Sequence, residues 1–95
     1  MNEWKFSGEI VRLKELDNSK NFKANITLRG SNIRKDINCT PVELGCMVPR
    51  NVYNHKIKLY KQIEAYGHFE TWTHITEGGN IKSTLSRVVD GFKAL

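Results

Sequence analysis

Three ring-bearing side chains, Tyr66, His68 and Trp72, fall at even-numbered positions of the segment 61–72. The odd-numbered positions between and before them are mostly apolar: Ile63, Ala65, Gly67, Phe69 and Thr71. Alternation with a period of two is typical of a half-buried strand, so we expect the rings on its outer face. Flat rings on an exposed sheet face can stack on the bases of a single-stranded nucleic acid.

The charge of the chain favours the same kind of ligand. Lys and Arg total 15 and Asp and Glu total 10, which gives a net charge of +5 at pH 7. A basic balance of this size favours a polyanion such as nucleic acid and, less strongly, an anionic membrane surface. The apolar fraction of 39% and the charged fraction of 26% are ordinary for a globular protein, so disorder of the whole chain is not expected.

Catalytic and metal-binding patterns are absent from the sequence. The cysteines and histidines lack the paired short spacings of zinc sites; they are Cys39, Cys46, His55, His68 and His74. Glu64 and Glu70 lie too far apart along one strand for a close carboxylate pair. Gly78-Gly79 indicates a turn and not a phosphate-cradling loop, because no Gly-Lys-Ser/Thr sequence that would begin a helix follows it. We therefore expect a protein that is not an enzyme and that needs no cofactor or metal.

The rest of the chain predicts strands that could position the rings. Trp4, Phe6, Gly8 and Ile10 alternate, and the phase then slips, which indicates a bulge or bend in one long strand that serves both halves of a small barrel. Trp4 and Phe6 share the core-facing phase, so we expect them to pack rather than to stack on bases. Residues 17–20 are a turn by composition.

A second strand is predicted over residues 22–29. Its inner face consists of Phe22, Ala24, Ile26 and Leu28. Gly30-Ser31-Asn32 predicts a tight hairpin, and a third strand is predicted over residues 33–40, with Ile33, Ile37 and Cys39 inward. Residues 41–56 contain Gly45 and Pro49, so only a short helix or an irregular connection is expected there.

The fourth strand is predicted over 61–72, with a possible earlier start at Ile57 and Leu59. A polar loop over 73–80 and a fifth strand from Ile81 to about Val89 complete the pattern. Five strands with the first one bent, and a non-strand connection between the third and fourth, predict an all-β OB-fold barrel. Ninety-five residues suffice for one compact core, so residues 1–95 are predicted to be a single domain.

Several segments resemble the bacterial single-stranded DNA-binding protein family. They are Phe22-Lys23-Ala24-Asn25-Ile26-Thr27-Leu28, the segment Gln62 to Thr71, and Ser86-Arg87-Val88-Val89-Asp90, with Gly8 where the family's first strand carries a glycine. The chain departs from the family pattern in its tight turn after the second strand and in lacking a third-strand Trp, a supported helix and an acidic tail. Asn38-Cys39-Thr40-Pro41-Val42 is similar to the compact, primosomal replication type.

The predicted fold and the resemblance together imply a binding site. In an OB-fold the ligand crosses the second and third strands between two loops. This geometry assigns phosphate contacts to Lys20, Lys23, Arg29, Arg34 and Lys35, with Lys82 on the returning strand. The resemblance implies base contacts by Trp72 and His74, which Tyr66 and His68 could join. As alternatives, the cations form a solvated strand face, Tyr66 and His68 face a second subunit, and the role of Phe22 stays open.

The expected function is binding of single-stranded DNA with little sequence preference, in replication, repair or recombination. Two alternatives are an adaptor of the primosomal type that contacts replication proteins, and an RNA-binding OB module. The resemblance implies a homodimer or homotetramer. No membrane-spanning run or signal-peptide pattern is visible, so a cytoplasmic location with reduced cysteines is expected.

Overall fold

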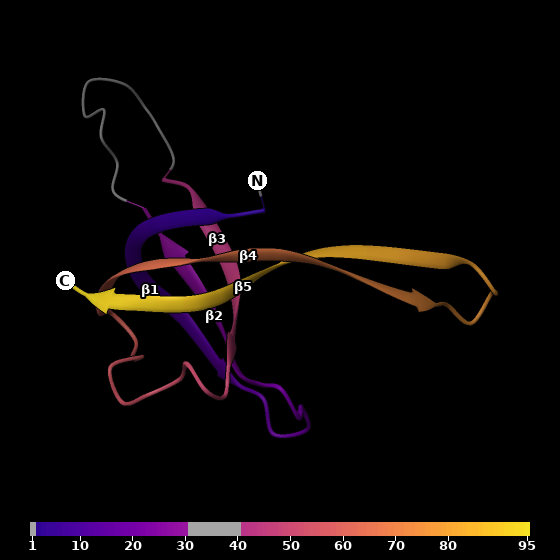
Figure 1. Cartoon of the computed structure of the whole chain (residues 1–95), viewed down its shortest axis with the longest axis horizontal. Helices are drawn as coiled ribbons and strands as arrows, with labels where there is room; N and C mark the ends of the chain where they lie inside the picture. The colour runs from indigo at the N-terminus through magenta and orange to yellow at the C-terminus, as the bar shows by residue number, and fades with distance from the viewer. Residues whose placement is uncertain (1, 31–40) are drawn as a thin grey trace.

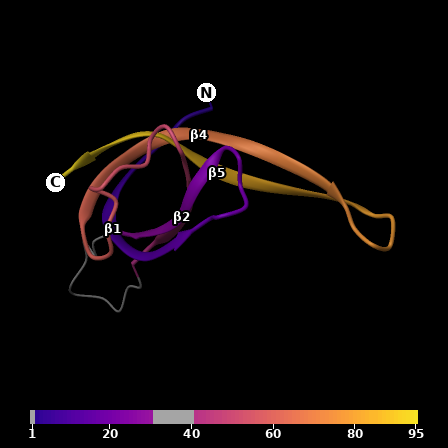
Figure 2. The ribbon, with the colours of Figure 1, turned by 90° about the horizontal axis from the view of Figure 1, so that it is seen from below.

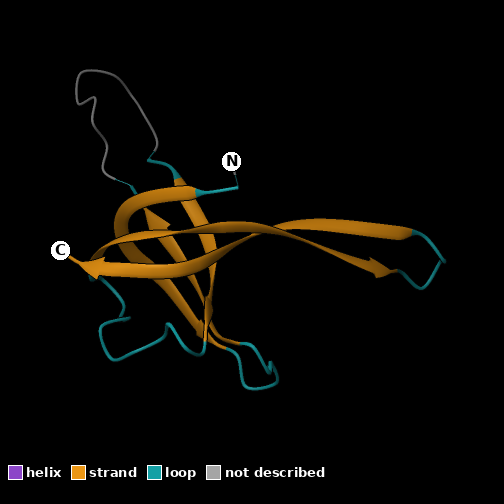
Figure 3. Cartoon of the chain, viewed as in Figure 1, coloured by secondary structure: helices purple, strands orange, loops and turns teal. Residues whose placement is uncertain are grey.

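The computed structural model describes residues 2–30 and 41–95. This part of the chain contains five strands, joined by loops and turns, and no helix (Figures 1 and 3). The strands are β1 (Trp4–Glu15), β2 (Phe22–Arg29), β3 (Glu43–Pro49), β4 (Gln62–Ile75) and β5 (Ile81–Ala94). They form a closed barrel in the order β1-β2-β3-β5-β4. All neighbours are antiparallel except β3 and β5, which meet at Met47 and Val88. The predicted all-β class is confirmed.

The bend in β1 lets this strand pair with two different neighbours. Its first half, Trp4–Glu9, pairs with β4, and its second half, from Glu9 onward, pairs with β2. The register with β2 shifts between Ile10 and Arg12, which confirms the bulge that the phase slip predicted. A Cβ at Gly8 would crowd the backbone carbonyl of Arg29, so this close approach of β1 and β2 requires glycine.

Small and branched apolar side chains fill the barrel. The fully buried cluster is Ile10, Ala24, Ile26, Leu28, Cys46, Val48, Ile57, Ile63, Ala65 and Val89. Trp4 and Phe6 pack against this cluster, as predicted. Burial raises the pKa of the Cys46 thiol to about 11, so Cys46 is a core side chain rather than a nucleophile.

The third strand lies later in the chain than predicted. Residues 33–40, predicted to be this strand, are outside the described residues; β3 instead occupies Glu43–Pro49, where an irregular connection was expected. Leu44, Cys46 and Val48 supply its inward side, whereas Gly45 and Pro49 obscured the alternation in the sequence. The tight turn predicted at 30–32 falls mostly on residues outside the described part of the chain; its first residue, Gly30, donates its N–H to the Val42 carbonyl at 2.9 Å.

The connection between β3 and β4 is irregular, and no helix occurs anywhere in its residues 50–61. Ile57, which was a possible start of the fourth strand, lies in this connection and is only 2% exposed. It inserts into the core, while Leu59 stays outside at 44% exposure. Val52 and Tyr53 of the same connection also pack against the core, so the connection contributes three apolar side chains to the barrel interior. Within residues 2–30 and 41–95, no helix is long and apolar enough to cross a membrane.

Strands β4 and β5 are longer than predicted, because β4 continues to Ile75 and β5 to Ala94. Beyond Phe69 the two strands leave the barrel as a two-stranded ribbon, which we call the arm (residues 70–86). Figures 1 and 2 show the arm projecting far from the other three strands. The predicted loop at 73–80 is reduced to a turn over residues 76–80.

Candidate nucleic-acid interface

A groove of about 1110 Å³ opens on the outer surface where the β1–β2 loop approaches the root of the arm. One wall comes from residues 14–22, and the other comes from β4 and β5. Met47 and Pro49 at the end of β3 lie between the two walls. The groove therefore lies between the β1–β2 loop and the barrel end of the arm.

Trp72 and Phe22 form an aromatic pair in this groove. Their ring centroids lie 5.4 Å apart, and the ring planes are tilted by 46°. Phe22 is half-buried, and Trp72 retains 36% exposure. Trp72 comes from the arm root and Phe22 from the start of β2, so the pair joins two segments that are distant in the sequence. The ring of Phe22, whose role the sequence left open, lines the groove beside Trp72.

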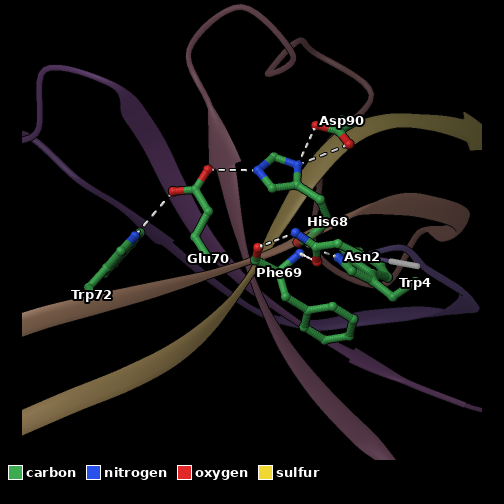
Figure 4. A network of polar contacts seen from close by, with 7 residues as sticks. All are labelled: Asn2, Trp4, His68, Phe69, Glu70, Trp72 and Asp90. Atoms are coloured by element: carbon green, nitrogen blue, oxygen red, sulfur yellow. Dashed lines mark hydrogen bonds and ion pairs between the residues drawn. The ribbon is translucent and has the colours of Figure 1, made fainter.

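A chain of polar contacts fixes the groove side of β4 (Figure 4). The indole Nε1–H of Trp72 donates to Glu70 Oε1 at 3.1 Å, and Glu70 Oε2 lies 2.6 Å from His68 Nε2. His68 Nδ1 in turn lies 2.9 Å from Asp90 Oδ1. Both ring nitrogens of His68 are thus occupied by carboxylates. His68 links β4 to β5 and does not offer a free ring edge to a base.

This network shifts the pKa values of His68 and Glu70. Hydrogen bonds to Glu70 and then to Asp90 raise the pKa of His68 above its ordinary value. Hydrogen bonds from His68 and then from Trp72 lower the pKa of Glu70. Each shift favours the charged form of its group, so the network holds an imidazolium between two carboxylates over a wider pH range than the free side chains would.

Residues that precede and begin β1 hold the backbone of β4 beneath this network. The Trp4 indole donates to the His68 carbonyl at 3.0 Å. The Asn2 side chain accepts from Phe69 N–H at 2.7 Å and donates to the Phe69 carbonyl at 2.9 Å, as Figure 4 shows. These bonds fix the backbone of the strand that carries Glu70 and Trp72, while the His68 network fixes its side chains.

A basic surface, which we call the outer face, adjoins the groove. Leu13 of β1 pairs with buried Ile26, so Arg12 and Lys14 on either side point outward. The outer face comprises the outward residues of three strands: Arg12, Lys14, Asn25, Thr27, Arg29, Glu43, Gly45 and Met47. Lys14 and Met47 also line the groove. The outer face and the groove are therefore continuous.

Glu43 holds two of the three cations of the outer face in ion pairs. Arg29 Nη2 lies 2.9 Å from Glu43 Oε2, and Arg12 Nη1 lies 3.2 Å from Glu43 Oε1. The hydrogen bond from Arg29 is the main cause that lowers the pKa of Glu43. All three side chains are partly exposed, so a phosphate could compete with the carboxylate for the guanidinium groups.

The charges of the groove have the opposite sign. Its lining includes the carboxylates of Glu15, Asp17, Glu70 and Asp90, whereas Lys14 is the one Lys or Arg in that lining. Part of this charge is compensated by His68. The described residues hold no group of three or more His, Cys, Asp or Glu side chains suited to a metal ion. Phosphates would thus be attracted to the outer face and repelled by the groove.

The structure brings together some of the predicted site residues and separates others. Trp72, His74 and Lys82 share one face of the arm, because His74 pairs with Lys82 two residues beyond Trp72. Tyr66 is 51% exposed but lies across Gly91 and lines a second, separate cavity with Trp4 and Lys5. Tyr66 is therefore not part of the aromatic pair.

The predicted phosphate contacts are spread along the barrel. Lys20 is exposed in the β1–β2 loop, and Lys23 lies at the irregularity between Phe22 and Ala24. Arg29 is at the opposite end of β2 and is paired with Glu43. Arg34 and Lys35 lie outside the described residues. The described cations Lys20, Lys23 and Arg29 thus lie along β2 and the loop before it and do not form one cluster.

Sequence reasoning missed Arg12 and Lys14 as well as the role of Glu70. The two cations could have been found, because they alternate with Leu13 in the second half of β1. The link from Glu70 through His68 to Asp90 had no sequence signal, since it depends on the register in which β4 pairs with β5.

The solved structures that are similar to this chain in fold include the following two. One is the dimeric structure of the N-terminal domain of PriB protein from Thermoanaerobacter tencongensis, with a TM-score of 0.69 and 12% identity over 99% of this chain and 96% of that chain. The other is the mitochondrial single-stranded DNA binding protein Rim1 of S. cerevisiae, with a TM-score of 0.62 and 11% identity over 98% and 93%. No protein-family model matches the chain, and a search of curated proteins finds no match. The resemblance predicted from the sequence is confirmed for the fold.

Proposed function

We propose that this chain binds single-stranded DNA, with the phosphates along the outer face and bases in the groove. The observation that carries the proposal is the partly exposed indole of Trp72, which lies beside Phe22 in a groove that continues onto a cationic face. Base–aromatic stacking contributes about 1–3 kcal/mol per base, and every base has a ring face that can take part. The mechanism therefore needs no catalytic group and gives little sequence preference.

The distribution of charge orients the strand in this proposal. Arg12, Lys14 and Arg29 attract phosphates to the outer face, whereas carboxylates line the groove. A DNA strand that crosses β2 and β3 lowers its electrostatic energy when its backbone faces the cations and its bases turn into the groove. Lys20 in the β1–β2 loop and Lys23 at the start of β2 extend the cationic path, and Lys82, which pairs with His74, extends it onto the arm.

Tryptophan fluorescence during titration with mixed-sequence single-stranded DNA tests the proposal. We expect quenching that saturates and a binding constant that falls steeply with salt, with a log–log slope of about −2 to −3 for four or so phosphate contacts. Trp4 is half-buried and held by the His68 carbonyl, so the Trp4→Phe variant should retain the quenching. No quenching together with no mobility shift would refute DNA binding.

The biological setting is part of the proposal. We propose a cytoplasmic protein of replication, repair or recombination that acts as a homodimer or homotetramer; the similar PriB structure is a dimer. If the protein is instead a primosome-type adaptor, a pull-down with it should enrich a helicase or primase more strongly than it enriches DNA. An RNA-binding module would prefer RNA in a competition with DNA of equal sequence, because only RNA carries the 2′-hydroxyl.

A further inference from the structure

We infer that Glu70 gives the groove a preference for bases that present an amino group over bases that present a keto group at the same ring position. This inference rests on the proposed function, because it concerns the base that stacks on Trp72. It predicts a preference at one position of the bound strand, within binding that otherwise depends on backbone and stacking contacts.

Glu70 is held at the edge of the stacking residue. Its Oε1 accepts the Trp72 indole N–H at 3.1 Å, and its Oε2 lies 2.6 Å from His68 Nε2. A base that stacks on the indole places its own edge near this carboxylate, since the two rings lie parallel at van der Waals distance. The Glu70 side chain is 40% exposed, so one face of the carboxylate is open to the groove.

The carboxylate retains hydrogen-bonding capacity after these two contacts. An ionised carboxylate offers about four lone-pair sites and no donor. The lowered pKa of Glu70, caused first by His68 and then by Trp72, keeps it ionised at neutral pH. Glu70 can therefore accept a further N–H from a ligand, but it repels a ligand oxygen.

Cytosine and uracil differ in the feature that such an acceptor distinguishes. Cytosine carries an N4 amino donor where uracil carries the O4 acceptor. Neither base has the 5-methyl group of thymine, so their ring sizes match and their stacking areas are nearly equal. A carboxylate beside the stacked ring thus favours cytosine through one charge-assisted hydrogen bond and disfavours uracil through repulsion.

The test compares oligo-dC with oligo-dU of equal length at mildly alkaline pH and fixed salt, with Trp72 fluorescence as the readout. We expect oligo-dC to bind about three- to tenfold more tightly, which is less than a buried charge-assisted hydrogen bond would give because the site is partly exposed. In Glu70→Gln the amide can keep the bond from Trp72 and present a donor in place of one acceptor. The dC preference should then disappear or reverse toward dU.

Asp17→Asn is the matched control. Asp17 also lines the groove, and the substitution removes the same charge, but Asp17 makes no contact with Trp72 among the described hydrogen bonds. We expect both oligomers to bind more tightly to this variant, with an unchanged dC-to-dU ratio. An altered ratio in both variants would mean that groove charge, and not Glu70, sets the preference, which would overturn the inference.

The remaining outcomes separate this inference from the function on which it rests. Equal affinities of the unaltered protein for oligo-dC and oligo-dU would overturn the base preference and leave DNA binding intact. Weaker binding of both oligomers to Glu70→Gln at an unchanged ratio would also overturn it, since Glu70 would then only position Trp72. Failure of the unaltered protein to bind either oligomer would overturn the proposed function itself.

Discussion

The Glu43→Gln substitution tests whether the DNA backbone contacts the outer face. Glu43 accepts hydrogen bonds from Arg29 at 2.9 and 3.1 Å and from Arg12 at 3.2 Å. Two of the three cations of the outer face are therefore engaged by one carboxylate when no ligand is bound. Glu43→Gln retains the size of the side chain and removes its charge, so both guanidinium groups become available to phosphates.

The size of the effect follows from charge and distance. Two unit charges about 4 Å apart in water interact by an amount that changes a binding constant roughly fivefold. We therefore expect Glu43→Gln to strengthen binding of single-stranded DNA about fivefold at low salt. One or two added phosphate contacts would also steepen the log–log salt slope by about 0.7 to 1.4. The ion pairs are partly exposed, so the unfolding midpoint should change little.

Fluorescence titrations at several salt concentrations measure both quantities. Glu3→Gln is the control, because it makes the same change in net charge beside the second cavity and away from the outer face. We expect it to change the affinity much less than Glu43→Gln does. If Glu43→Gln leaves both affinity and slope unchanged while the unaltered protein binds DNA, the strand does not contact Arg12 and Arg29, and the assignment of the outer face is wrong.

Three further predictions concern the groove wall and the barrel. Trp72→Ala should weaken DNA binding by about 1–3 kcal/mol through lost stacking and lower the free energy of unfolding by only about 1 kcal/mol; a larger loss in urea unfolding would mark Trp72 as a core residue. Because the pKa of His68 is raised, its stabilising contribution is fully present below about pH 6.5 and is lost as the pH rises through the raised value. The partner Glu70, with a lowered pKa, contributes above its ordinary pKa and loses its contribution as the pH falls through the lowered value. His68→Gln should therefore reduce the difference in thermal midpoint between mildly acidic and mildly alkaline buffer, and an unaltered difference would contradict the network. A Cβ at Gly67 would overlap the Val88 carbonyl oxygen, so Gly67→Ala should cost about 3 kcal/mol or more, whereas Gly45→Ala, with open space around it, should be tolerated in the same unfolding measurement.

The strands that could be predicted are those with one buried side. The alternation in β1, β2 and the barrel half of β4 follows from a core on one face and solvent on the other. In β3 the same alternation spans only Leu44, Cys46 and Val48, and Gly45 and Pro49 interrupt its signal. Within the arm, residues 73–75 were predicted to be loop, because both faces of the ribbon are exposed there and no burial pattern marks the strand.

For the candidate site, the sequence predicted individual outward-facing residues but not the contacts between strands. An aromatic ring on the outward phase of a strand is visible in the sequence, and Trp72 was found in this way. The carboxylates around it were not found, because Asp90 reaches His68 only through the pairing of β4 with β5. The ion pairs of Glu43 could not be found either, since they depend on the placement of β3 at Glu43–Pro49.

The two tryptophans lie in parts of the molecule that should differ in local stability, one in the barrel and one in the arm. Trp4 packs against the barrel core, whereas Trp72 lies at the root of a ribbon whose tip residues, Ile75 and Ile81, are 73% and 74% exposed. A two-stranded ribbon without a core is marginal in water, so its amides should exchange with deuterium through local opening well before the barrel opens. Thermal unfolding followed at Trp72 alone should then precede unfolding followed at Trp4 alone, and this chain would depart from two-state behaviour despite its small size.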